Sequence, residues 1–414
     1  MSFKEWKYID ATTFCGGVTD GTHDSPKRQS IGKPLITSKH IKGWSIDFEN
    51  AYLISEDDYN KINERSKVSQ WNVLISMIGE YCGYCFVEKN EIIDYAVKNV
   101  GIFKTKNEAD AKWLYYYLNS TEGVNTLKSL RSGTSQPYLS LSVLRSLPIL
   151  VPPTNQMKEK IVSILSSLDD KIENNYATNQ NLEEIARTLF KEWFINFNYP
   201  NAGGNLKQSE FGEIPAGWEV GALGDIYKTT SGGTPSRSKP EYYENGSIGW
   251  VKSKELNNSF IIDTEEKITP DALKNSSAKL LPKHSVLIAI AGATIGEVGI
   301  TAHEFACNQN ACVFLPNGNY PFTFIYHFLR QSKDDIVGRS VGSAQPYISQ
   351  QTLLQYRLVT PPSELVQEYH RIVFPLFQKI KDNIEENESL KALRDNLLPK
   401  LMSGEIIVNS SITQ

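Results

Sequence analysis

"GTSQPYLSLSVLRSLPILVPPTNQ" (Gly133–Gln156) and "GSAQPYISQQTLLQYRLVTPPSEL" (Gly342–Leu365) share one unusual pattern, in which a Gly, a Gln-Pro-Tyr and a Pro-Pro fall at the same spacing. Gln345 minus Gln136 gives 209, and the Pro-Pro pairs keep the same offset, so the register holds without a gap. A period of this length is far longer than the repeats of solenoid proteins. We therefore expect a duplicated domain and a pseudo-twofold relation between the two halves.

A second matched stretch lies upstream in each half. "VLISMIGEYCG" (Val73–Gly83) aligns with "VLIAIAGATIG" (Val286–Gly296) at an offset of 213, so that Gly79 corresponds to Gly292. The second copy continues as "AGATIGEVG" (Ala291–Gly299), whose third Gly has no counterpart in the first copy, and this difference in Gly spacing argues against a nucleotide-binding loop. A strand followed by a turn with close backbone approach explains both copies better.

Cys82 and Cys85 in the same stretch resemble half of a zinc site. The repeat places Ile295 and Val298 at the matching positions, and no second Cys or His pair has ligand spacing. We therefore interpret these cysteines as core residues. The total of five cysteines, an odd number without framework spacing, favours a reducing compartment.

The residue pattern of both halves changes after the Pro-Pro. Before it, short apolar runs between Gly, Pro and Asn clusters predict strands and loops, with short helices at "AKWLYYYLNS" (111–120) and "FTFIYHFLRQ" (322–331). After it, a long segment poor in Gly opens with Thr154 or Ser363 as a plausible N-cap. Each half is thus expected to be a mixed α/β globule followed by a long helix.

The two long segments carry a coiled-coil seam. Apolar residues and two asparagines follow a 4,3,4,3 spacing in the first segment: Ile161, Leu165, Leu168, Ile172, Asn175, Asn179, Leu182, Ala186, Leu189 and Trp193. The second segment follows at a constant offset of 208: Val373, Leu376, Ile380, Asn383, Asn387, Leu390, Arg394, Leu397 and Leu401. Buried Asn at seam positions fixes register at some cost in stability.

A twofold relation makes the two helices antiparallel and predicts that Asn175 faces Asn387 and that Asn179 faces Asn383. The second helix is expected to be the less regular one. Pro375 should kink it, Pro399 should end or bend it, and Arg394 puts a charge on the seam.

The predicted fold class is α+β, with two homologous mixed α/β domains separated by two long antiparallel helices that form a coiled coil. The length of 414 residues is too great for one ordinary core and suits two or three domains. The predicted boundaries are 1–150 for the first globule, 151–200 for the central helix, 201–362 for the linker and second globule, and 363–414 for the last helix and tail.

Composition favours a folded protein outside the membrane. Apolar residues make up 40% and charged residues 22%, both near the average for globular proteins. No apolar run approaches the roughly 20 residues needed to cross a bilayer, and the start lacks a signal segment. We expect a cytoplasmic protein.

The chemistry expected of an enzyme is missing from the sequence. It contains no Gly-x-x-x-x-Gly-Lys-Ser/Thr loop, no His-Glu-x-x-His and no Gly-x-Ser-x-Gly elbow. Six histidines without a ligand cluster predict no metal. The sequence therefore favours binding over catalysis.

Basic and hydroxyl residues gather in the early loops of both halves. Such residues neutralise phosphates and can contact base edges, although the net charge of −4 gives no global attraction to DNA. The alternative is that these residues form an ordinary solvated surface of mixed charge. The presence of a similar cluster in both copies favours DNA contact over this alternative. The predicted DNA-binding residues are Arg28, Lys33, Lys39, His40, Lys42, Ser231, Thr234, Ser236, Arg237, Lys239, Lys252 and Lys254.

These features resemble the specificity subunits of type I restriction-modification systems. The marks are "GEIPAGWEV" (212–220) opening the second copy, "TSGGTP" (230–235) after it, and the Pro-Pro-to-helix junction in both. The family usually has Glu-Gln shortly after the Pro-Pro, whereas this chain has Asn155-Gln156 and Glu364-Leu365. That departure affects local capping only.

The resemblance implies a non-catalytic protein that binds double-stranded DNA. Each globule would be a target recognition domain for one half of a split sequence, and the helices would set the spacing and dock two methyltransferase subunits. Restriction and translocase subunits would complete the complex. No cofactor is expected in this chain, because S-adenosylmethionine, ATP and Mg would belong to the partner subunits.

Two other classes of function remain open at this stage. The chain could be the recognition portion of a single-chain or two-subunit enzyme that also cuts or methylates, against which the missing motifs argue. It could also be a coiled-coil scaffold for a ligand other than nucleic acid, such as a polysaccharide. A DNA-binding assay titrated with salt separates these classes, because phosphate contacts make affinity fall steeply with salt.

Overall fold

A computed structural model describes residues 6–43, 45–133, 136–342, 346–406 and 408. Gln345, one anchor of the repeated phrase, lies outside these residues. The chain divides into two compact units. Unit 1 contains residues 1–172 and 390–414, and unit 2 contains residues 173–389. The division falls within both long helices, so each unit holds part of each helix.

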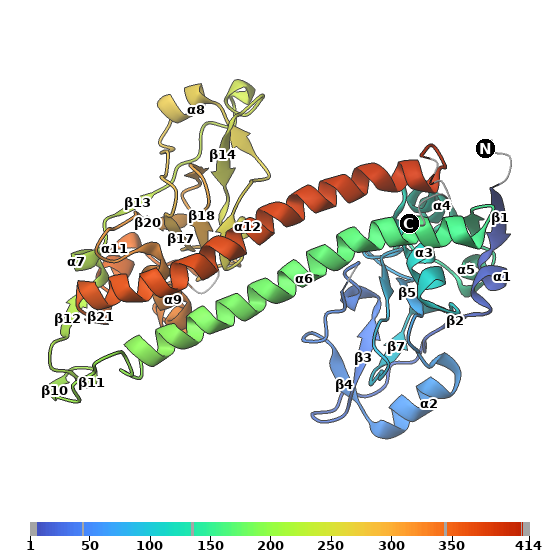
Figure 1. The fold of residues 1–414 in the computed structure, drawn as a ribbon, viewed down its shortest axis with the longest axis horizontal. Coiled ribbons are helices and arrows are strands. Elements are labelled where there is room, and N and C mark those ends of the chain that lie inside the picture. Colours follow the sequence, from blue (N-terminus) through green and yellow to red (C-terminus); the bar gives the residue numbers. More distant parts are fainter. Residues whose placement is uncertain (1–5, 44, 134–135, 343–345, 407, 409–414) are drawn as a thin grey trace, which may run out of the picture. The chain divides into compact units, whose positions relative to one another are not determined.

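Unit 1 is built from short strands and helices followed by the start of the long helix α6 (Figure 1). Its elements before α6 are β1 (Lys7–Asp10), α1 (Ala11–Cys15), β2 (Val18–Asp20), β3 (Lys33–Thr37), β4 (Tyr52–Ile54), α2 (Glu56–Ser66), β5 (Val73–Ser76), β6 (Cys85–Val87), β7 (Ala96–Lys98), β8 (Val100–Phe103), α3 (Glu108–Asn119), α4 (Thr121–Leu130), α5 (Leu141–Arg145) and β9 (Pro148–Val151). Helix α6 runs over Asn155–Phe194.

The strands of unit 1 form a four-stranded sheet in the order β2-β8-β5-β6 and a three-stranded sheet in the order β4-β3-β7. All residues of β5 and β8 are buried, as their continuous apolar runs predict for a central pair. Helix α3 covers this sheet with Trp113, Leu114 and Tyr117. The small sheet and α2 lie farther from the helix than the large sheet does (Figure 1).

Unit 2 repeats this plan with additions. Its elements are β10 (Leu206–Ser209), β11 (Gly212–Pro215), β12 (Glu219–Ala222), α7 (Leu223–Ile226), β13 (Thr229–Ser231), β14 (Ile248–Val251), β15 (Ser259–Ile261), β16 (Lys267–Ile268), α8 (Pro270–Lys274), β17 (Val286–Ala289), β18 (Val298–Thr301), β19 (Ala306–Cys307), β20 (Ala311–Phe314), α9 (Phe322–Gln331), α10 (Lys333–Gly338), α11 (Gln350–Leu354), β21 (Arg357–Thr360) and α12 (Ser363–Met402).

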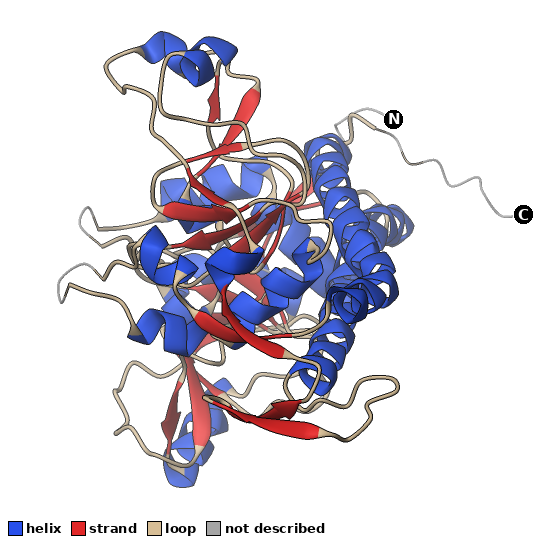
Figure 2. Ribbon diagram, turned by 90° about the vertical axis from the view of Figure 1, so that its left-hand side faces the viewer, coloured by secondary structure: helices blue, strands red, loops and turns tan. Residues whose placement is uncertain are grey.

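The sheets of the two units correspond strand by strand. In unit 2 the order β13-β20-β17-β18 matches β2-β8-β5-β6, with β15 added at the edge, and β16-β14-β19 matches β4-β3-β7. The strands β14 and β19 pair in parallel, as do β3 and β7. Figure 2 draws the strands in red and the helices in blue, and short helices lie among the strands. The α+β organisation predicted from the repeat is confirmed.

The repeated phrase holds the same place in both units. Tyr138 bridges to Ile78, and Tyr347 bridges to Ala291, which are equivalent positions in the two copies. Both bridges close beside a glycine with φ +85°, Gly79 or Gly292. The phrase thus ties the end of each globule to the turn after its central strand, which is why the two sequence anchors recur together.

Both long segments are single helices of 40 residues, α6 and α12. The second continues through Pro375 and Pro399 and ends at Met402, so the helix does not end at Pro399, and the alternative bend there stays a prediction, as does the kink at Pro375. Ser403 still donates to the Pro399 carbonyl, at 3.0 Å. Among the residues described, no helix is both long and apolar enough to cross a membrane.

The charge that Arg394 places on the seam has a partner in unit 1. Its guanidinium lies 2.8 Å from the Asp169 carboxylate, which also accepts from the Tyr116 hydroxyl at 2.7 Å. At the equivalent place in unit 2, His327 instead packs among the rings of Phe190 and Phe377. The seam therefore has a polar end in unit 1 and an aromatic end in unit 2.

The five cysteines are buried and free, as the core interpretation predicts. The Cys82 thiol lies 3.4 Å from the Met77 carbonyl, and burial raises its pKa. Within the described ranges, no group of three or more His, Cys, Asp or Glu side chains has the geometry to hold a metal.

Candidate nucleic-acid interface

The two small sheets present the same loops in both units. Thr22 donates to the Val97 carbonyl at 3.1 Å, and Gly233 donates to the equivalent Cys307 carbonyl at 2.9 Å. A Cβ added to Gly21 would lie 2.2 Å from the Val97 oxygen, and one added to Gly232 would lie 2.2 Å from the Cys307 oxygen. Only glycine fits these positions, so the close approach anchors the loop that follows in each copy.

A 3-10 turn follows the central strand of each small sheet, β3 in unit 1 and β14 in unit 2. These turns cover Ser38–His40 and Ser253–Glu255. The Thr37 N–H donates to His40 Nδ1 at 3.0 Å, whereas the Lys252 N–H donates to Glu255 Oε2 at 2.7 Å. An imidazole in one copy and a carboxylate in the other thus cap the same turn.

His40 was predicted to contact DNA, and the structure does not support that role. The residue is 1% exposed, and burial lowers the pKa of its imidazole. A neutral, buried ring offers no charge to a phosphate. Lys39 and Lys254 stand at equivalent positions just before the capping residue, and both are exposed. We define these turns, with the cations around them, as the cationic tips.

The cationic tip of unit 1 keeps most of its charge unpaired. The Arg28 guanidinium lies 4.9 Å from the centre of the Tyr52 ring, and the Lys42 ammonium lies 3.9 Å from that of Tyr81. Aromatic rings position a cation without neutralising it. In the part of the chain that the structure describes, no carboxylate pairs with Lys39.

Lys33 is the exception at this tip. Its ammonium group lies 2.7 Å from the Asp94 carboxylate, and this hydrogen bond raises the pKa of the lysine. A phosphate would have to compete with Asp94 for it. Arg28, Lys39 and Lys42 are therefore the better candidates for contact with a polyanion.

The cationic tip of unit 2 is compensated by carboxylates. Glu266 lies 2.7 Å from Arg237 and 2.7 Å from Lys252, and Glu265 lies 2.7 Å from Lys254 and 3.4 Å from Lys252. Hydrogen bonds from the lysines lower the pKa of both carboxyls, so both are ionised at neutral pH. These two carboxylates pair with all three cations, and Glu255 adds a third carboxylate within the turn itself.

Stacking also holds Arg237 in place. Its guanidinium lies 4.3 Å from the centre of the Tyr243 ring and 5.1 Å from that of Trp250. The indole of Trp250 donates to the Gly233 carbonyl at 3.0 Å, which fixes the ring against the loop. More than half of the arginine side chain, 54%, remains exposed. Arg237 is thus pre-positioned for a planar acceptor such as phosphate or guanine.

The other predicted residues of unit 2 lie at the end of β13, in the case of Ser231, and on the loop that follows it. Ser231 and Ser236 are exposed, and the Ser236 hydroxyl lies 2.8 Å from that of Ser238. The Thr234 hydroxyl donates a hydrogen bond to the side-chain oxygen of Gln309. The Lys239 ammonium donates to the Tyr242 hydroxyl at 3.0 Å. These residues offer hydroxyls and one further cation close to Arg237 in the chain.

Glu265, Glu266, Tyr52, Tyr243 and Trp250 were not identified from the sequence. A signal for these residues lies in the repeat. Aligning the two small sheets pairs Lys39 with Lys254, and the residues around these two lysines then differ between the copies. Leu35 is registered against Tyr52, and the equivalent Trp250 donates to the Glu266 carbonyl. Tyr52, which stacks on Arg28, and Glu266, which pairs with Arg237, therefore occupy equivalent positions in the two copies of the repeat.

The seam asparagines form hydrogen-bonded pairs within unit 2. Asn175 donates to Asn387 at 2.9 Å, and Asn383 donates to Asn179 at 2.8 Å, which are the pairs that the antiparallel register predicts. Asn175 also donates to Glu386 at 2.8 Å. Any slip along the seam would separate these groups and leave buried amides unsatisfied.

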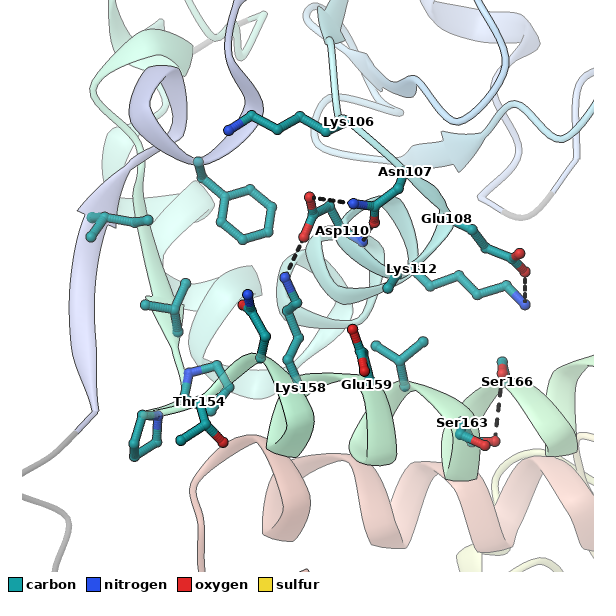
Figure 3. Close-up of a pocket in the computed structure, with 18 of the residues that line it drawn as sticks. Lys106, Asn107, Glu108, Asp110, Lys112, Thr154, Lys158, Glu159, Ser163 and Ser166 are labelled. Carbon is teal, nitrogen blue, oxygen red and sulfur yellow. Dashed lines mark hydrogen bonds and ion pairs between the residues drawn. The ribbon is translucent and has the colours of Figure 1, made fainter. Parts of the chain in front are cut away.

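A pocket also lies between α3 and the start of α6 in unit 1 (Figure 3). The Asn107 side chain caps α3 by accepting from the Asp110 N–H at 2.9 Å. Lys158 of α6 pairs with Asp110, and Lys112 pairs with Glu108 at 2.8 Å. The Lys158–Asp110 pair joins the two helices, and Lys112 also lies 3.7 Å from Asp170 of α6, so these charges have a structural explanation.

Comparison with known proteins places the chain beside one group. The model of the type I restriction modification DNA specificity domain matches residues 21–184 and again residues 215–392. The type I restriction enzyme MjaIX specificity subunit of Methanocaldococcus jannaschii is 34% identical over 337 residues, covering 79% of this chain and 76% of the relative. The HindI specificity subunit of Haemophilus influenzae is 28% identical over 411 residues, covering 83% and 88%.

A solved structure shares the fold. The type I restriction-modification S subunit from M. genitalium superposes with a TM-score of 0.59 at 17% identity, covering 96% of each chain. The two matches to the domain model fall one in each half, as the internal repeat predicts.

Proposed function

Because this chain belongs to the family of type I restriction modification DNA specificity subunits, we propose that each globule reads one half of a bipartite DNA target. Members of this family are DNA-recognition components and not catalytic ones. The observation that carries the proposal is the cationic tip, which the repeat places at the same position of both globules. Its cations suit the phosphate backbone, and the stacked Arg237 suits a planar base edge.

The long helices supply the remaining parts of this function. They connect the readers and serve as the surface on which two methyltransferase subunits dock, with restriction and translocase subunits completing the complex. S-adenosylmethionine, ATP and Mg act in those partners, and this chain holds no cofactor of its own. The asparagine pairs keep the helices in one register, so that the spacing between half-sites stays constant.

A domain exchange tests the division between readers. Residues 1–150 are replaced by the first domain of another family member, and the methylated sequence is determined in a host that carries the complete system. One half of the target should change while the other stays the same. A simultaneous change of both halves would contradict independent reading.

An insertion tests the role of the helices as a spacer. Adding one heptad to both α6 and α12 preserves the seam and lengthens each helix by about 10 Å, at roughly 1.5 Å per residue. The non-specific spacer should then grow by about three base pairs, at about 3.4 Å each. Methylation of substrates that differ only in spacer length measures the preference. An unchanged preference would rule out the helices as the ruler.

A further inference from the structure

The two cationic tips hold their arginines differently at one position of the repeat. Tyr52 in unit 1 is registered against Leu35, and Glu266 in unit 2 accepts a hydrogen bond from Trp250, the residue equivalent to Leu35. The ring leaves the Arg28 charge available, whereas the carboxylate compensates Arg237. The same fold thus carries an open cation in one copy and a shielded one in the other.

The neighbouring position repeats this contrast. Lys254 lies 2.7 Å from Glu265, and the residue equivalent to Glu265 in unit 1 is Ala51, which precedes Tyr52. Lys39, the equivalent of Lys254, has no carboxylate partner among the residues that the structure describes. Glu265 and Glu266 therefore supply the ion pairs at the second turn that Lys39 lacks at the first.

The backbone fixes the two carboxylates against the cations. Glu255 accepts from the Glu265 N–H at 2.8 Å and from the Lys252 N–H at 2.7 Å, so it ties the acidic loop to the turn. The Glu266 carbonyl accepts from the Thr264 hydroxyl at 2.7 Å. These bonds hold the backbone of both glutamates beside the turn, and the carboxylates meet the cations in a geometry that a phosphate oxygen could also occupy.

Stability gives little reason for this arrangement. Arg237 and Lys254 are more than half exposed, at 54% and 59%, and exposed ion pairs add little to folding. Their effect on DNA binding is larger. A cation already paired with a carboxylate releases no counterion when it meets a phosphate, so it contributes little to binding that ignores sequence.

Resting on the proposed function, we propose that Glu265 and Glu266 are specificity-determining residues of the second globule. They act as internal counterions that weaken sequence-independent binding through Arg237, Lys252 and Lys254. At its target sequence, base contacts hold the second globule on the DNA. The phosphates can then replace the carboxylates as partners of the three cations, so affinity rises chiefly at the target. The first globule, with Tyr52 and Ala51 at these positions, lacks this restraint.

The test measures binding of the full chain to a duplex of unrelated sequence over a series of salt concentrations. The double variant E265Q/E266Q keeps the side-chain shape and uncovers the cations. We expect tighter binding and a slope of log affinity against log salt that is steeper by about 1.8, from about 0.9 for each of two phosphates gained. The single variant E265Q, which changes one exposed side chain, should give about half of this shift.

E244Q/E304Q is the matched control. It removes two exposed carboxylates from the same globule, and neither forms an ion pair within the described part of the chain. Its slope should equal that of the wild type. An equal shift in control and test variants would mean that net charge alone acts, and this would overturn the proposal.

Other outcomes separate this inference from the proposed function. If the wild type binds DNA and E265Q/E266Q has the same slope, the shielding role is wrong and the proposed function stands. If the variant loses discrimination at one base pair with an unchanged slope, a glutamate reads a base and does not shield. If neither protein binds DNA at any salt concentration, both the proposed function and this inference fail.

Discussion

The two globules share one plan but differ in how they treat charge. In unit 1 the cations of the tip rest on aromatic rings, while the half-buried Asp169–Arg394 pair lies at the helix seam. In unit 2 the tip is compensated by Glu265 and Glu266, while the seam is closed by aromatic rings around His327. The duplicated fold therefore fixes the positions of equivalent side chains, while the charge at each of those positions differs between the two units.

The largest expected effect concerns the polar end of the seam. Asp169→Leu leaves the half-buried Arg394 without its main partner and removes the acceptor of the Tyr116 hydroxyl. Breaking such a pair should destabilise unit 1 by about 3 kcal/mol. Urea unfolding measures the loss, and hydrogen exchange of α3 locates it in unit 1.

The double variant D169F/R394A sharpens the comparison. Phe377 and Ala186 stand at the equivalent positions of unit 2, so the variant gives both ends of the seam the same residues. Much of the lost stability should return, because no unpaired charge remains. A double variant as unstable as D169L would show that the two ends are not interchangeable.

The aromatic end should lose stability as the pH falls. Burial lowers the pKa of His327 to about 3, whereas an unfolded histidine titrates near 6.5. Its contribution to stability is fully present above pH ~6.5 and is lost as the pH falls towards the folded pKa. At pH ~5 the loss should reach about 2 kcal/mol, from roughly 1.36 kcal/mol per pH unit.

His327→Phe removes this titration and suits the surrounding rings of Phe190 and Phe377. Glu183 lies 3.9 Å from the imidazole, and its pKa is raised by burial, so it titrates in the opposite sense in both proteins. The difference between wild type and variant therefore isolates His327. Equal slopes of stability against pH would show that the imidazole is not buried in its neutral form.

The smallest effect separates the two cationic tips. Lys39→Ala should weaken DNA binding and reduce the salt slope by about 0.9, because Lys39 has its charge available. Lys254→Ala, its equivalent, should change the slope much less, since Glu265 already compensates that lysine. Anisotropy titrations with a duplex of unrelated sequence compare the two. A larger effect for Lys254 would reverse the assignment of open and shielded tips.

Periodicity made the helical part of this protein predictable. The seam of Leu, Ile and Asn at 4,3,4,3 spacing, repeated at an offset of 208, is enough to pair Asn175 with Asn387, and these side chains are hydrogen-bonded. Register in a helix pair depends on the order of residues alone. The prolines were harder to judge, because tertiary packing holds α12 together through Pro399 despite its missing N–H.

The cationic tips were only partly predictable. Lys39 and Lys254 are exposed as expected, but His40 proved to be a buried cap, since a ring nitrogen can replace a carboxylate in accepting a turn N–H. Nothing in its position among lysines distinguishes it from a surface cation. Lys33 and Lys252 look alike in the sequence, and their partners Asp94 and Glu266 follow them by 61 and 14 residues, spacings that no local pattern marks.

The sequence by itself determined the duplication, the α+β organisation, the helix register and the family, because each depends on the order and spacing of residues. Only the tertiary structure decided which cations are open and which are shielded. Tyr52 and Glu266 reach their arginines across neighbouring strands and loops, and the attraction of a carboxylate acts over a few ångströms of space whatever the separation along the chain.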